Sequence, residues 1–190
     1  WPDISPARLK VRFKINIYRI RQAIGQDVIV FEDDRYRFNR TINYTWDREE
    51  FDKLFERLRQ SIARSERRKL LEQAAAFLKG DYLADLDADW VVLDRLKYQE
   101  IYRYLLLELA AVYLQDGQAH DCLNTARRIL RSDPLLESAH RLIIQAYASL
   151  HDPANMTIQY RQYQQTLENE LGLAPSSEIS TLYEQLMATI

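Results

Sequence analysis

The chain has 190 residues, of which 47% are hydrophobic and 28% charged, with four glycines, five prolines and a formal net charge of −2 at pH 7. This composition is typical of a folded, largely helical chain of one or two domains and excludes a disordered one. One cysteine excludes an internal disulfide framework and is typical of a cytoplasmic protein. No apolar run approaches the ~18 residues of a membrane helix, so we expect no membrane partner. The chain starts at Trp1 and not at methionine, which indicates a fragment of a longer protein.

The charge is unevenly distributed. Residues 1–40 carry nine Lys or Arg against five Asp or Glu, a net charge of +4, and the remainder carries −6. A basic segment on an acidic body indicates that a polyanionic partner would bind the first 40 residues. A solvated charged surface is the alternative explanation.

Residues 5–25, SPARLKVRFKINIYRIRQAIG, contain two competing periodicities. The first half alternates apolar and polar residues like a strand, whereas the second half repeats apolar residues at helical spacing. Ser5 as N-cap, Pro6 at the first helical position and Gly25 as the stop favour one helix over the whole stretch. The expected inward face consists of Phe13, Ile17, Ile20 and Ile24, with Arg8, Arg12 and Arg19 on one flank and Lys10, Lys14 and Arg21 on the other.

The next residues, DVIVFEDDRYRFN, predict a β-hairpin. Two β-prone runs, 28–31 and 36–38, flank a four-residue turn at 32–35. A basic helix followed by a hairpin with Arg35 and Arg37 near its tip is the order found in winged-helix domains. In those domains the helix enters the major groove of DNA and the wing contacts the backbone or the minor groove.

From residue 45 onward the sequence predicts helices only. In the longest of them, Trp90 and Leu93 begin an apolar stripe that continues through Ile101 and Leu105. Trp90 is expected to anchor the helix by packing against residues 77–83. The predicted helices span about 45–62, 66–79, 88–115, 119–131, 135–150, 154–171 and 177–189.

Inward-facing positions recur in this helical part at an interval of 34, which indicates stacked tetratricopeptide-like helical hairpins. Asp133 and Pro134 end one helix and start the next. The expected fold class is therefore mainly α, with helical hairpin repeats preceded by a partial winged helix made of one helix and a β-hairpin. The repeated pairs are Tyr113 and Tyr147, Ala126 and Tyr160, and Ile129 and Tyr163.

The stretch DCLNTARRILRSDPLLESAH, residues 121–140, indicates a joint between two helices and not an active site. Cys122 lies on the inward small-residue position of the repeat and His140 is expected to form a hydrogen bond between helices, so both are expected to be structural. The sequence DLDAD at 85–89 lacks the glycine of a calcium loop and is expected to be a solvated linker and helix cap.

No catalytic residue, metal ligand or cofactor site is predicted anywhere in the chain. The three histidines form no metal-binding pair, and there is no C-x-x-C and no glycine-rich phosphate loop. No serine or cysteine has a credible base in its sequence context. The chain is therefore not expected to be an enzyme.

Residues 70–187 resemble the bacterial transcriptional activator domain family. The stretches that carry the resemblance are FLKGDYL, DWVVLDR, LAAVYLQDG, SDPLLESAHRLIIQAYA and YRQYQQTLENELGLAPSSEISTLYEQL. The combination that makes it specific is Trp90 with Arg95, Asp133 and Pro134 with Glu137 and His140, and Glu170, Leu171 and Gly172 with Pro175. The resemblance implies an all-helical, tetratricopeptide-like domain directly after a response-regulator-type winged helix.

Residues 1–44 resemble the C-terminal part of such a winged helix, and residues 45–190 would then be the activator domain. WPDISPAR resembles the approach to the recognition helix, YRIRQAIG its end and VIVFEDDRYRFN the wing. The chain departs from the family where Arg35 replaces the usual glycine before the wing tyrosine, and where Val11 and Ile15 occupy outward turns of the helix.

The resemblance implies a transcription regulator of the kind found among antibiotic-pathway activators. DNA is its expected partner, together with proteins such as the transcription machinery or other domains of the same chain. The alternative, which Val11 and Ile15 favour, is a protein-interaction module of a signalling protein whose winged-helix remnant no longer reads DNA. The expected DNA-binding residues are Arg8, Arg12, Lys14, Arg19, Arg21, Arg35 and Arg37.

Overall fold

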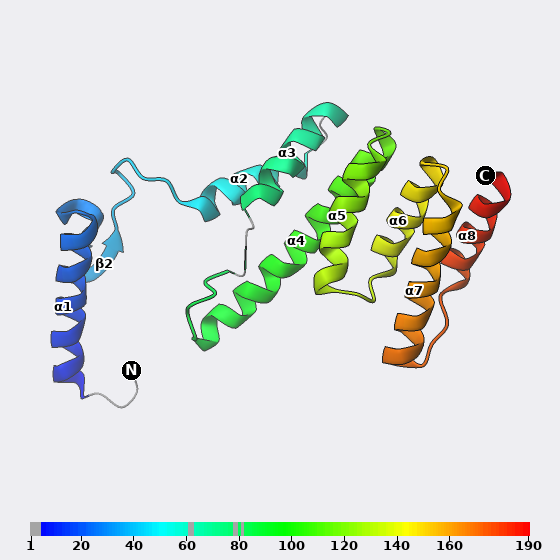
Figure 1. Ribbon diagram of the computed structural model, residues 1–190. Coiled ribbons are helices and arrows are strands. Elements are labelled where there is room, and N and C mark those ends of the chain that lie inside the picture. The colour runs from blue at the N-terminus through cyan, green and yellow to red at the C-terminus, as the bar shows by residue number, and fades with distance from the viewer. Residues whose placement is uncertain (1–4, 61–62, 78–79, 81) are drawn as a thin grey trace. The chain divides into compact units, whose positions relative to one another are not determined.

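The computed structural model describes all residues except 1–4, 61–62, 78–79 and 81, and it is mainly α-helical (Figure 1). The chain divides into two compact units, Trp1–Asp47 and Arg48–Ile190. No helix in the described part of the chain is long and apolar enough to cross a membrane.

The first unit contains one helix and a β-hairpin, as predicted. Its elements are α1 (Pro6–Ile24), a 3₁₀ turn (Gln26–Val28), β1 (Ile29–Glu32) and β2 (Arg35–Phe38). Helix α1 is continuous through the stretch with conflicting periodicities. It ends at Gly25, whose φ of 146° is unfavourable for residues with a side chain and whose N–H bonds to the Arg21 carbonyl at 2.9 Å. Ser5 precedes the helix as predicted, but its side chain makes no capping hydrogen bond.

The hairpin turn is shorter than the predicted four residues. Glu32 and Arg35 are partners in the β-ladder, which leaves only Asp33 and Asp34 in the turn. Both have positive φ, 50° and 58°, as the two central residues of a type I′ turn require. Aspartate tolerates this conformation better than most residues, so the DD pair, and not the whole EDDR stretch, makes the turn.

The prediction that one apolar face of α1 packs inward is wrong for most of that face. Only Ile17 is buried, while Phe13, Ile20 and Ile24 are 41%, 37% and 71% exposed. Within this unit the hairpin is the element available to cover the helix, and it covers a narrow strip. One contact between them is that of the rings of Phe13 and Tyr36, whose centroids lie 5.3 Å apart.

The described residues of the second unit form helices that follow one another along it, so the predicted helical body is confirmed (Figure 1). Helix α4 packs against α3 and α5, and α6 packs against α5, α7 and α8. The helices are α2 (Asp47–Leu58), α3 (Arg64–Phe77), α4 (Asp89–Gln115), α5 (Ala119–Ser132), α6 (Glu137–Ser149), α7 (Pro153–Leu171) and α8 (Ser177–Thr189).

The 34-residue interval reappears in the backbone. Gly117 after α4 and His151 after α6 both adopt positive φ, 73° and 53°. The Gln118 N–H, which follows Gly117, donates to the Tyr113 carbonyl at 2.8 Å. The Asp152 N–H, which follows His151, donates to the Tyr147 carbonyl at 3.0 Å. The α4–α5 and α6–α7 pairs are therefore equivalent tetratricopeptide-like hairpins.

Two apolar clusters hold this unit together, one on each side of α4 and α5. Isolated hairpins cannot bury such faces, so each relies on its neighbour. The fully buried large side chains of the first cluster are Ile143, Ile144, Met156 and Ile179, and those of the second are Leu71, Leu105, Leu106 and Ile129.

The predicted anchoring role of Trp90 is wrong. Its side chain is 62% exposed, and Leu93 on the same face is 75% exposed. The inward face of this part of α4 is instead formed by Val91, which is fully buried, and Tyr98, which is 5% exposed. The first turns of α4 are rotated by about one residue, or 100°, relative to the predicted stripe.

Arg95 takes over the anchoring of this part of the helix. Its guanidinium donates hydrogen bonds to the carbonyls of Tyr82, Leu83 and Leu86 at 3.2, 2.9 and 3.3 Å. The predicted capping by the DLDAD segment is not observed, because the N-cap residue is Ala88 and it provides no side-chain bond. Among the described residues, no group of three or more His, Cys, Asp or Glu side chains could hold a metal ion.

Candidate functional site

The basic side chains of the first unit lie on α1 and on β2. Arg8, Arg12 and Arg19 follow one another at helical spacing and share one face of α1. Val11 and Ile15 lie between them and are 59% and 45% exposed, so these two residues point outward as predicted. The exposed cations among the predicted DNA-binding residues are Arg8, Arg12, Lys14, Arg19, Arg35 and Arg37.

Arg21 differs from these six because it is partly buried and its guanidinium donates to a backbone carbonyl of the unit. It is partly buried, and its Nε and Nη2 donate to the Ile29 carbonyl at 3.2 and 2.7 Å. This contact ties the end of α1 to the first strand of the hairpin. Arg21 therefore orients the hairpin relative to the helix.

The turn of the hairpin carries carboxylates beside the two arginines of β2. Glu32, Asp33 and Asp34 surround the turn, and Asp33 lies 3.6 Å from Arg37 in an exposed ion pair. Such a pair contributes little energy in water and can open. In this hairpin the groups that suit a phosphate are therefore Arg35 and Arg37, and not the carboxylates of the turn.

His140 of α6 forms the expected hydrogen bond between helices, and Cys122 of α5 is buried as expected. Cys122 is fully buried, and burial raises the pKa of its thiol to about 11. His140 is 4% exposed, and its Nε2 lies 2.9 Å from the Pro134 carbonyl while its Nδ1 lies 2.9 Å from Gln159 Nε2. Burial lowers the pKa of His140, which favours the neutral ring.

The family of the helical part follows from comparison with known proteins. Residues 46–187, well over half of the chain, match the bacterial transcriptional activator domain. The chain belongs to this family. No curated protein matches it.

A solved structure similar to the chain is that of Mycobacterium tuberculosis EmbR in complex with a low affinity phosphopeptide. The TM-score is 0.71 at 17% sequence identity, and the match covers 100% of this chain and 52% of the EmbR chain. At this identity the likeness concerns the fold. The chain spans about half the length of the EmbR chain.

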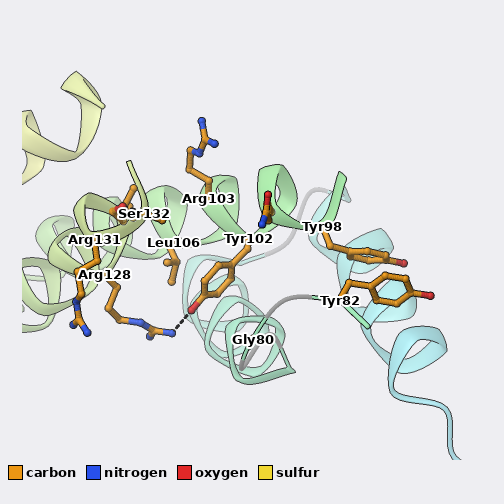
Figure 2. Close-up of a pocket in the computed structure, with 11 residues that line it drawn as sticks. Gly80, Tyr82, Tyr98, Tyr102, Arg103, Leu106, Arg128, Arg131 and Ser132 are labelled. Atoms are coloured by element: carbon orange, nitrogen blue, oxygen red, sulfur yellow. Dashed lines mark hydrogen bonds between the residues drawn. The ribbon is translucent and has the colours of Figure 1, made fainter. Parts of the chain in front are cut away.

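The activator domain has a pocket between α4 and α5 that the sequence did not predict (Figure 2). Its volume is about 510 Å³. The Arg128 guanidinium donates a hydrogen bond to the Tyr102 hydroxyl, and Arg103 is neutralised by Glu100 at 3.0 Å and Asp133 at 3.2 Å. The side chains that characterise it are Tyr82, Tyr98, Tyr102, Arg103, Arg128 and Arg131.

A second groove of the activator domain, with a volume of about 500 Å³, lies between α5 and α7. Arginines from α5 and uncharged polar side chains from α7 form its polar groups, and Leu130 and Pro134 add apolar surface. A signal was present in the sequence, because QYRQYQQTLEN places amide side chains at helical spacing on one face of α7. Only the packing of α7 on α6 places that face opposite the arginines of α5.

Proposed function

We propose that this chain is the regulatory part of a transcription regulator, in which residues 1–44 bind DNA as the C-terminal part of a winged helix. Residues 45–190 would be the activator domain and would contact protein partners. The observation that carries the proposal is the group of six exposed cations on α1 and β2, in a chain whose helical part belongs to an activator-domain family.

The arrangement of α1 suits a major groove. A helix fits this groove, and its side chains read base edges while neighbouring cations bind phosphates. On α1, Arg8, Arg12 and Arg19 lie beside the exposed Val11 and Ile15. Apolar side chains in a major groove contact thymine methyl groups, so these two residues would favour A·T pairs in the site.

The proposal is tested by fluorescence anisotropy with a labelled 20-base-pair duplex at two salt concentrations. We expect weak binding, in the ~10⁻⁴ to 10⁻⁶ M range of non-specific complexes, with an affinity that falls steeply as salt rises. Removing an arginine that binds a phosphate reduces the slope of log K against log salt by about one. Arg12→Ala, Arg19→Ala and Arg37→Ala should each do so.

Arg59→Ala is the matched control, because Arg59 is an exposed arginine of the other unit. It should leave both the affinity and the salt slope unchanged. Binding that is independent of salt, or that Arg59→Ala weakens as much as Arg12→Ala does, would contradict a role for α1. Arg21→Ala is a different case, because it should disturb the hairpin as well as the charge.

A second candidate function is a protein-interaction module, which the exposed apolar residues of α1 favour. Val11, Ile15 and Tyr18 are 59%, 45% and 63% exposed and lie on one face. If this face contacts a protein, the double change Val11→Ser and Ile15→Ser should leave DNA affinity unaltered. If it contacts bases, the same change should alter the preference for A·T pairs.

The proposed function places the protein in the cytoplasm, where bacterial DNA is accessible. It assigns no catalytic residue, metal or cofactor to the chain. Protein partners of the activator domain would be components of the transcription machinery or other domains of the same protein.

A further inference from the structure

We propose that the groove between α5 and α7 binds a short acidic segment of a partner protein in extended conformation. This inference deepens the proposed function, because it rests on the activator domain having a protein partner, and it names the surface and the chemistry of that partner.

The α7 wall of the groove is a row of uncharged hydrogen-bonding side chains. Gln159, Gln162, Thr166 and Asn169 lie at helical spacing on one face, and Gln165 lies beside them. An amide side chain carries both a donor and an acceptor, as a peptide group does. A row of amides can therefore bind successive peptide groups of an extended chain whatever its side chains are.

Gln159 is held with its acceptor uncommitted. The Pro134 carbonyl can only accept, so His140 Nε2 must carry the proton and His140 Nδ1 must be the acceptor. The amide nitrogen of Gln159, 2.9 Å from Nδ1, is then the donor of that bond. Within the described residues, the carbonyl oxygen of Gln159 has no partner and can accept an N–H from a bound peptide.

The α5 wall supplies positive charge. Arg127 is fixed by donating to the Tyr147 hydroxyl at 2.5 Å, and most of its N–H groups remain for another acceptor. Arg131 is exposed and forms no ion pair in the described part of the chain. None of the described residues that line the groove is a carboxylate. In a body with a net charge of −6, this local excess of two positive charges selects acidic side chains.

The dimensions fit a peptide of four or five residues. The row from Gln159 to Asn169 spans about 15 Å at 1.5 Å per helical residue. An extended chain covers that distance with four or five residues at about 3.4 Å each. Its side chains alternate in direction, so every second residue would face α5.

Nucleic acid fits this groove less well than an acidic peptide does. A nucleic-acid strand carries one phosphate per nucleotide and is bound through many cations and stacked aromatic rings. The groove offers two arginines, and its one aromatic ring among the described lining residues, His140, is 4% exposed and already stacked on Tyr163, which leaves no ring free for a base. The amide row, in contrast, matches peptide groups.

The probe is a fluorescein-labelled, capped octapeptide of alternating glutamate and alanine. The control peptide has glutamine in place of each glutamate. Anisotropy of the full chain at 50 mM salt should show saturable binding of the glutamate peptide and at least tenfold weaker binding of the glutamine peptide. Arg131→Glu should weaken the glutamate peptide at least tenfold, and Gln162→Ala with Asn169→Ala about fivefold.

Two matched controls lie on α7 but outside the groove. Arg161→Glu makes the same charge reversal, and Gln164→Ala makes the same amide truncation, at exposed positions that do not line the groove. Both should bind the glutamate peptide within twofold of the unchanged chain. All the substituted positions are exposed. Thermal melts should therefore confirm that each variant is folded.

The proposal is overturned if the glutamate peptide shows no saturable binding at 1 mM, if the glutamine peptide binds equally, or if Arg161→Glu weakens binding as much as Arg131→Glu. It is also overturned if the 20-base-pair duplex displaces the peptide, since the groove would then be a nucleic-acid site. Duplex binding of Arg131→Glu is measured in parallel. Unchanged duplex affinity with lost peptide binding assigns the two activities to separate surfaces, so the failure of one is distinguished from the failure of the other.

Discussion

Glu137 is expected to be the most sensitive polar position of the activator domain. It is the first residue of α6, and its carboxylate accepts hydrogen bonds from the Tyr163 hydroxyl of α7 at 3.0 Å and from the Ser176 hydroxyl at 2.7 Å. Ser176 is also the N-cap of α8 and accepts from the Ile179 N–H at 3.3 Å. One carboxylate therefore joins three helices.

The expected cost of Glu137→Ala follows from the two bonds that it removes. A hydrogen bond to a charged group contributes about 1.5 to 3 kcal/mol. Tyr163 is 2% exposed, so its hydroxyl would find no water to replace the lost carboxylate and the whole hydrogen-bond energy would be lost. Ser176 is partly exposed, so its hydroxyl can bond to water instead. We expect a loss of about 2 to 4 kcal/mol in the free energy of unfolding. Glu137→Gln keeps one acceptor oxygen and should lose about half as much.

Urea unfolding followed by circular dichroism measures this loss, and hydrogen exchange of the α8 amides locates it. Glu178→Ala is the control, because Glu178 is 78% exposed and pairs with Arg141 at 3.7 Å, an arrangement worth less than about 1 kcal/mol. A double-mutant cycle with Tyr163→Phe should give a coupling energy of at least about 1 kcal/mol. If Glu137→Ala costs no more than Glu178→Ala, the three-helix role of Glu137 is refuted.

Three further predictions concern burial. Trp90→Ala should change the free energy of unfolding by less than about 1 kcal/mol, because the side chain is mostly exposed. Leu106→Ala, at a 1% exposed position, should cost about 2 to 5 kcal/mol. Equal losses of melting temperature for the two variants would contradict the observed rotation of α4. Burial lowers the pKa of His140 below its unfolded value of about 6.5. The neutral ring therefore contributes fully to the free energy of unfolding above that pH, and its contribution declines as the pH falls below it. His140→Gln should make the free energy of unfolding less dependent on pH between about pH 7 and 5.5, as measured by urea unfolding. The Cys122 thiol, with its pKa of about 11, should resist iodoacetamide at pH 8 until urea unfolds the chain, and rapid labelling of the folded chain would show that the site opens.

The local rules of the sequence were sufficient for most elements. Pro6 and Gly25 determined α1 against a competing strand pattern, because proline starts helices and glycine adopts the backbone conformation that ends this one. The 34-residue interval determined the helical hairpins, and Gly117 and His151 show why: each pair of helices closes through the same turn. The burial of Cys122 was also predictable from its position in the repeat.

Other features depended on tertiary packing. Sequence periodicity measures the spacing of apolar residues along a helix but not the side on which the neighbouring helix lies, so Trp90 and Leu93 were placed inward when Val91 and Tyr98 form the buried face. The same limit hid the groove between α5 and α7. Its arginines and amides are about 30 residues apart in the sequence, and only the packing of α5 and α7 on α6 places them opposite each other. Side chains on separate helices meet through the packing geometry of those helices, and no local sequence pattern records that geometry.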